Sequence, residues 1–86
     1  MAYDVARIRA DFPSLESGIA FFCGPGGSQV PRVVGDAISK AITQATSNRG
    51  TVTLSERNAD ECVLGYRSAV SDLLNCDPRG VIYGRS

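Results

Sequence analysis

Only two short runs of this chain have the composition of buried β-strands, and most of the sequence lies between them. The first is Ile19–Phe22, which glycines bound, and the second is Val81–Tyr83, which opens into the polar turn Gly84–Ser86. Two strands this far apart do not make a stable sheet alone, because independent stability needs about three strands or a packed layer of helices. The sequence therefore predicts either that helices cover the strands or that the chain is the opening part of a larger protein.

Helix signals occupy the rest of the sequence. Asp4 is a suitable N-cap for a short helix that Pro13 ends. Pro31 suits the first turn of a longer helix. The apolar residues of that helix form one stripe, at positions 33, 34, 37, 38, 41, 42 and 45.

A second long helix is predicted after Thr53, because Thr53 and Glu56 have the spacing of a capping box. Its apolar face runs from Ala59 to Leu74, and Asn75 ends it. The predicted order is helix, strand, helix, helix, strand. The sequence therefore predicts an α/β fold, held in a single partial domain over residues 1–86.

Composition excludes several classes of function. Nine Lys and Arg residues balance nine Asp and Glu residues among the 86, so the chain lacks the positive charge typical of proteins that bind nucleic acid or anionic membranes. No apolar stretch approaches the length of a transmembrane helix, and the N-terminus lacks the apolar region of a signal peptide. We expect a cytoplasmic protein with no nucleic-acid or membrane partner.

The three cysteines do not predict a metal site. Cys23, Cys62 and Cys76 lack C-x-x-C spacing, and the chain contains no histidine. We expect reduced thiols, with Cys62 packed on the apolar face of its helix. Cys23 follows the first predicted strand, where functional side chains often project, but a buried, unreactive thiol is the favoured interpretation.

A glycine-rich loop, Gly24-Pro25-Gly26-Gly27, follows Cys23. Its glycines permit a close approach of backbone to a ligand, and the helix that follows favours an anion. The loop lacks the Gly-Lys-Ser/Thr of a Walker motif, and Gln29 stands where a dinucleotide fingerprint needs its third glycine. A tight strand-to-helix turn with no ligand is the other interpretation.

Two basic residues are further candidates. Lys40 is the chain's lone lysine and is predicted to lie on the solvated face of its helix. It is therefore a poor candidate for a Schiff base, which needs a partly desolvated amine. Arg49, beside Gly50 in a polar loop, is either a clamp for a carboxylate or phosphate or an ordinary exposed arginine.

Four stretches in order resemble the N-terminal portion of the class V aminotransferase and cysteine desulfurase family, closest to its actinobacterial desulfurase-like branch. They are residues 3–9 with Phe12-Pro13, residues 21–31, residues 48–55 and residues 81–86. The family has an Asp-x-Ala-Ala loop ending in Gln-x-Pro, a His-Arg-Gly-x-His-x-Leu-Ser loop, and a strand that enters a Gly-Thr-Thr turn. The resemblance covers nearly the whole chain, which would be about the first fifth of such an enzyme.

The resemblance implies a pyridoxal-phosphate enzyme of fold type I that acts on an amino acid as a homodimer or higher oligomer. Residues 1–30 would form an arm and the glycine-rich loop, and residues 31–86 the first helices and strand of the cofactor domain. It places the loop Cys23–Gly26, with Gly24 and Pro25, on the substrate side of the cofactor.

The other matched positions concern the interface and the phosphate. The resemblance places Asn48 and Arg49 in a loop at the dimer interface that faces the substrate, and it assigns the cofactor phosphate to Gly84, Arg85 and Ser86. The family's catalytic lysine, aspartate and histidine match nothing in this segment. Cys23 replaces the family's aspartate, and Asn48 and Thr53 replace its loop histidines.

The resemblance therefore predicts part of a desulfurase, aminotransferase or lyase that is not catalytic alone. The alternative function is a small non-catalytic module that buries its two helical stripes against a partner or a second copy.

Overall fold

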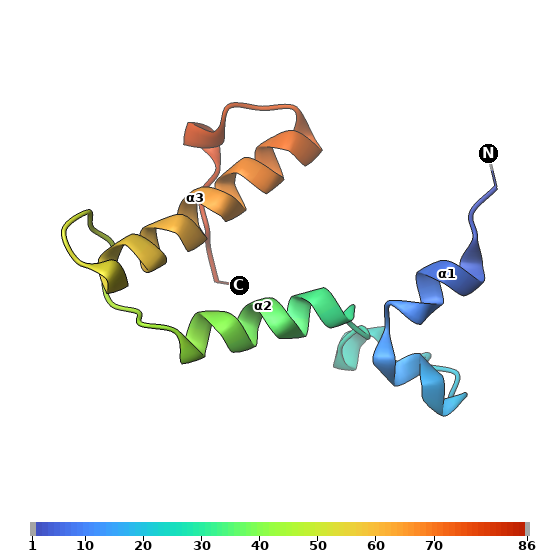
Figure 1. Ribbon diagram of the computed structural model, residues 1–86. Helices are drawn as coiled ribbons and strands as arrows, with labels where there is room; N and C mark the ends of the chain where they lie inside the picture. The colour runs from blue at the N-terminus through green and yellow to red at the C-terminus, as the bar shows by residue number, and fades with distance from the viewer. Residues whose placement is uncertain (1, 86) are drawn as a thin grey trace. The chain divides into compact units, whose positions relative to one another are not determined.

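Helices make up all the regular secondary structure that the computed structural model shows over residues 2–85, the part of the chain that it describes (Figure 1). The α-helices are α1 (Val5–Ala10), α2 (Arg32–Thr43) and α3 (Leu54–Leu74). Three short 3-10 turns accompany them, η1 (Pro13–Ser17), η2 (Gly24–Gly26) and η3 (Pro78–Gly80). The predicted α/β fold is wrong, because neither predicted strand is present among these residues.

Both predicted strands are irregular segments, and solvent covers much of each. Phe22 is 93% exposed and Ile82 is 84% exposed. A strand is stabilised by hydrogen bonds to a neighbouring strand, and no other described segment pairs with Ile19–Phe22 or with residues 81–85. Apolar composition alone therefore does not make these runs strands.

The chain divides into two compact units, Met1–Lys40 and Ala41–Ser86, with the boundary inside α2. In the first unit, the Asp4 carboxylate accepts a hydrogen bond from the backbone N–H of Arg7 at 3.1 Å, which confirms the predicted N-cap. Pro13 starts η1 after Asp11 and Phe12, the two residues that follow α1, and Gly18 ends η1 with a left-handed φ of 75°. The N–H of Arg32 donates to the carbonyl of Asp11 at 2.8 Å and fixes the start of α2 against the end of α1.

The second unit is organised around α3. The hydroxyl of Thr53 accepts from the N–H of Glu56 at 3.2 Å, as the capping-box spacing predicts. The Glu56 carboxylate accepts from the N–H of Val52, at 3.2 Å, so the return bond of the box is made one residue earlier than usual. Asn75 ends α3 in the left-handed conformation, with φ 53°.

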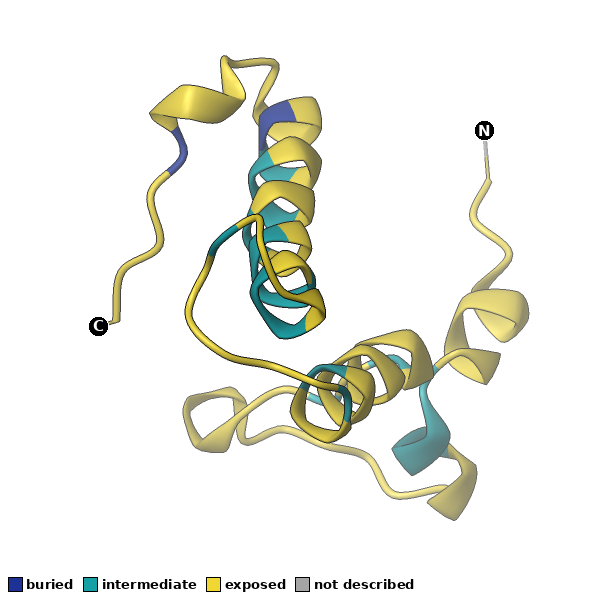
Figure 2. Cartoon of the chain, turned by 60° about the vertical axis from the view of Figure 1, so that its left-hand side comes forward, coloured by how far each residue is buried: buried dark blue, intermediate teal, exposed yellow. Residues whose placement is uncertain are grey.

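Few side chains are buried in the described part of the chain (Figure 2). Among the described residues, the buried ones are Val81, a hydrophobic residue that is 8% exposed, and Ser71, a polar residue that is 5% exposed. Half-buried residues follow one side of α3 in Figure 2, whereas Val33 and Ile42 of the predicted α2 stripe are 72% and 78% exposed. The apolar stripe of α2 therefore has the spacing of an amphipathic helix, but Val33 and Ile42 are not buried in a core.

Candidate functional site

The glycine-rich loop folds as a tight 3-10 turn. The N–H of Gly26 donates to the carbonyl of Cys23 at 3.1 Å, and the N–H of Gly27 donates to that of Gly24 at 3.0 Å. Gly27 has a φ of 122°, which side-chain-bearing residues rarely adopt. The turn therefore depends on glycine at this position.

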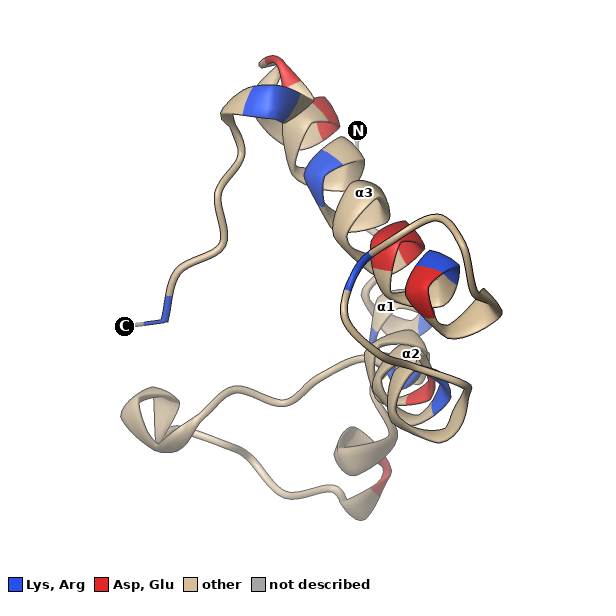
Figure 3. Cartoon of the chain, turned by 90° about the vertical axis from the view of Figure 1, so that its left-hand side faces the viewer, with Lys and Arg blue, Asp and Glu red and all other residues tan. Residues whose placement is uncertain are grey.

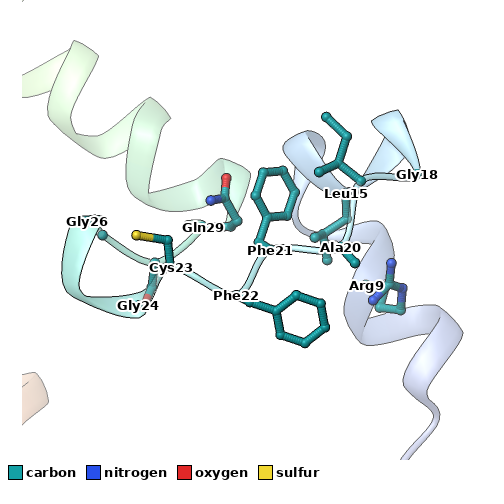
Figure 4. Close-up of a pocket in the computed structure, with 13 residues that line it drawn as sticks. Arg9, Leu15, Gly18, Ala20, Phe21, Phe22, Cys23, Gly24, Gly26 and Gln29 are labelled. Atoms are coloured by element: carbon teal, nitrogen blue, oxygen red, sulfur yellow. The ribbon is translucent and has the colours of Figure 1, made fainter.

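This turn borders an open pocket of about 790 Å³ in the first unit (Figure 4). Three residues of the predicted substrate-side loop, Cys23, Gly24 and Gly26, line it together, whereas Pro25 does not. The other lining residues come from the end of α1, from η1 and from the segment that links η1 to α2: Arg9, Leu15, Gly18, Ile19, Ala20, Phe21, Phe22, Gly27, Ser28 and Gln29.

Arg9 and Gln29 are pocket residues that the sequence did not nominate. Arg9 lies on a helix that was predicted correctly, but nothing in the spacing distinguishes it from Arg7, two positions earlier. Gln29 belongs to the stretch 21–31 that carries the resemblance, but no role in a site was predicted for it. The fold of the linking segment places both in the lining of the pocket that the glycine turn borders.

The thiol of Cys23 is exposed, which contradicts its favoured interpretation as a buried thiol. It lies close to Gly26, where an added Cβ would be 3.2 Å from the sulfur. That spacing is tighter than an ordinary van der Waals contact, so a side chain at position 26 would press on the thiol. The absence of a side chain at Gly26 therefore lets the Cys23 thiol lie where it does, beside the pocket.

The predicted interface loop is attached to the first turns of α3. Arg49 Nε donates to Asp60 Oδ1 at 2.7 Å, with 43% and 26% of the two side chains exposed. Asn58 Nδ2 donates to the carbonyl of Ala45 at 2.9 Å, and Arg57 Nη1 donates to that of Val52, also at 2.9 Å. Asp60 therefore holds the guanidinium of Arg49 through its Nε. Sequence spacing did not indicate this partner.

Asn48, the other predicted residue of this loop, is exposed. Its backbone carbonyl accepts a hydrogen bond from the hydroxyl of Ser47 at 3.1 Å. This contact is local and leaves the Asn48 side chain in solvent.

The predicted phosphate turn lies at the end of the described residues. Gly84 and Arg85 are exposed, and Arg85 makes no ion pair with any described residue. A Cβ added to Gly84 would meet nothing within 4 Å. Ser86, the third predicted residue, lies outside the described residues.

A smaller hollow of about 410 Å³ lies between α3 and residues 82 and 83. The rings of Tyr66 and Tyr83 meet edge to face there, with centroids 6.3 Å apart. Cys62, predicted to be packed, lines this hollow but is exposed. Tyr66 Oη and Arg67 Nε are buried there and have no hydrogen-bond partner. The polar groups beside the ring contact are therefore not all hydrogen-bonded.

Charges in the second unit are mixed in sign (Figure 3). Two arginines, Arg57 and Arg67, lie among four acidic residues along α3. After α3, at η3, Arg79 pairs with Asp77 at 2.7 Å. The side-chain hydrogen bonds from Arg79, followed by the one from its backbone N–H, lower the pKa of Asp77 below its usual value.

Residues 2–85 provide neither a metal site nor a membrane-spanning helix. No three side chains of His, Cys, Asp or Glu come together there as a metal site would require. None of the described helices combines the length and apolar character needed to cross a membrane.

Comparison with known proteins gives one informative similarity. The chain is 38% identical, over 84 residues, to Uncharacterized protein MT3887 of Mycobacterium tuberculosis (strain CDC 1551 / Oshkosh). The aligned region is 98% of this chain but 21% of that protein, so the chain spans about a fifth of the relative's length. No protein family and no solved structure matches the chain.

Proposed function

We propose that this chain is part of a pyridoxal-phosphate enzyme that acts on an amino acid, similar to the cysteine desulfurases and class V aminotransferases. The observation that carries the proposal is the pocket at the glycine turn. Cys23, Gly24 and Gly26, three residues that the resemblance assigns to the substrate side, line this one pocket. In this proposal the segment supplies part of the substrate-binding surface and none of the catalytic groups.

The length of the similar mycobacterial protein supports the proposal. The resemblance implies that this chain corresponds to about a fifth of an enzyme, and the aligned region is 21% of that protein. The whole enzyme would carry out desulfuration, transamination or a related lyase step.

The described residues fit only one edge of a cofactor site. Lys40 is exposed on α2, so its amine lacks the desolvation that a Schiff-base lysine needs. Of the described residues, Gly84 could contact the cofactor phosphate through its exposed backbone, and Arg85 could contact it through its guanidinium. When bound, pyridoxal phosphate supplies an electron sink for the substrate's carbanion, and residues of a longer protein would have to hold it covalently.

The same proposal includes a cytoplasmic homodimer. Asn48 and Arg49 would lie at its interface, facing the amino-acid substrate. Arg49 suits this role because Asp60 engages its Nε while the side chain stays 43% exposed. The two terminal nitrogens of the guanidinium are then available to a carboxylate.

Borohydride trapping should separate this segment from the whole enzyme. With added pyridoxal phosphate, the 86-residue chain should give no specific, stoichiometric adduct by mass spectrometry, because its lysine is solvated. A longer protein that contains this chain should give one adduct and should lose its visible absorbance band on reduction. A stoichiometric adduct on Lys40, or a longer protein with no affinity for the cofactor, would contradict the proposal.

A second candidate function, a self-associating module without catalysis, is favoured by the apolar surface of the second unit. Leu73 is 81% exposed, Leu74 is 66% exposed and Tyr83 is 72% exposed. Large apolar side chains left exposed in this way can mark an interface.

Light scattering of the isolated chain tests the apolar surface directly. We expect a concentration-dependent dimer or larger species, because association would bury the side chains at the end of α3. Leu73→Glu should shift the chain toward monomer, whereas Glu61→Gln, which leaves this surface apolar, should not. A monodisperse monomer at high concentration would argue against self-association.

A further inference from the structure

We infer that the pocket beside the glycine turn binds a small carboxylate with an apolar body, and that Arg9 recognises the carboxylate. This goes beyond the proposed function, because such binding needs neither a cofactor nor the rest of an enzyme. The pocket's size, about 790 Å³, is in the range of small-molecule sites, roughly 300–1,000 Å³.

Charge selects the ligand class. Arg9 is the lining residue that carries a formal charge, and no aspartate or glutamate lines the pocket with it. The whole stretch from residue 17 to residue 31 is uncharged (Figure 3). No described carboxylate forms an ion pair with Arg9, so its guanidinium is available to an anion, which it can hold with two parallel hydrogen bonds.

The walls of the pocket select an apolar body. Leu15, Phe21 and Phe22 are large apolar residues of its lining, and Phe22 is 93% exposed. In the view of Figure 4, Arg9 and Cys23 lie well apart, with both phenylalanines drawn between them. A ligand that places its carboxylate at Arg9 can therefore bury its body against the aromatic rings, which favours binding by roughly 25 cal/mol per Å² of apolar surface covered.

These two features together distinguish an organic carboxylate from inorganic phosphate. A single guanidinium neutralises one negative charge, and the aromatic walls offer no donors for further oxygens. Ser28 and Gln29 line the pocket as neutral polar residues, and the Gln29 amide lies at the far end from Arg9 in the same view. The predicted ligand is thus a monocarboxylate rather than a dianion.

A titration followed by NMR tests the inference on the 86-residue chain. The probes are 3-phenylpropanoate and its neutral amide, which share an apolar body and differ in charge. The acid should bind about two- to fivefold more tightly than the amide, as expected for an exposed charge pair. Its shifts should centre on Arg9, Phe21 and Phe22, and its advantage should fall as salt rises.

Two arginine variants provide the matched comparison. Arg9→Gln should remove the advantage of the acid, whereas Arg7→Gln, which changes the same charge on α1 outside the pocket, should keep it. Equal binding of acid and amide by the unmodified chain would overturn the inference even if Arg9→Gln perturbed α1. Equal losses in both variants, or displacement of the acid by an equal concentration of inorganic phosphate, would also overturn it.

Discussion

Val81→Asp should detach residues 81–85 from α3. Val81 is the buried hydrophobic residue of the described chain, and it follows η3, which contacts α3. Burial of a valine side chain contributes about 1.5–3 kcal/mol, and an isolated carboxylate is strongly disfavoured in its place. The charged side chain should therefore move into solvent and take the segment with it, at a cost of about 2 kcal/mol in the free energy of unfolding.

The aromatic contact between Tyr66 and Tyr83 reports this release. Its nuclear Overhauser effects should disappear in Val81→Asp, and the midpoint of thermal unfolding should fall. Ile82→Asp is the matched control, because Ile82 is the next residue and is 84% exposed. If both variants keep the ring contact, or if both lose it, Val81 does not anchor the segment.

Gly50→Ala should destabilise the N-terminus of α3. A Cβ at position 50 would overlap the carboxylate of Glu56. That carboxylate accepts the hydrogen bond from the N–H of Val52, so moving it removes a cap from the start of the helix. Loss of a cap costs about 0.5–2 kcal/mol, and hydrogen exchange at Val52 and in the first turn of α3 should accelerate.

Gly65→Ala is the control of opposite sign. Gly65 lies in the interior of α3, and a Cβ there would meet nothing within 4 Å. Alanine should stabilise the helix by about 0.5–1 kcal/mol relative to glycine, seen as greater helicity by circular dichroism. Equal stabilisation by Gly50→Ala would show that the Glu56 carboxylate can move without loss of the cap.

The helix termini could be predicted from the sequence because they depend on neighbouring residues. The Asp4 cap and the Thr53–Glu56 pair each join residues three positions apart, and Asn75 ends α3 through its own backbone conformation. The two strand predictions failed for the converse reason. A strand needs a partner elsewhere in the chain, and the described residues provide none.

The candidate pocket was predicted only in part. Cys23, Gly24 and Gly26 could be nominated because they are adjacent in sequence and their composition is distinctive. Arg9 could not, since its place in the pocket depends on how the segment from η1 to α2 folds back toward α1.

The sequence by itself determined the capped helices, the glycine turn and the balance of charge, all of which follow from residue identity and short spacing. Only the tertiary structure decided that Val81 is buried, that Arg9 joins the glycine turn in one pocket, and that Asp60 holds Arg49 from eleven residues away. Each of these contacts joins residues from different elements. Their free energy depends on where the intervening chain places them, and short-range sequence patterns do not encode that placement.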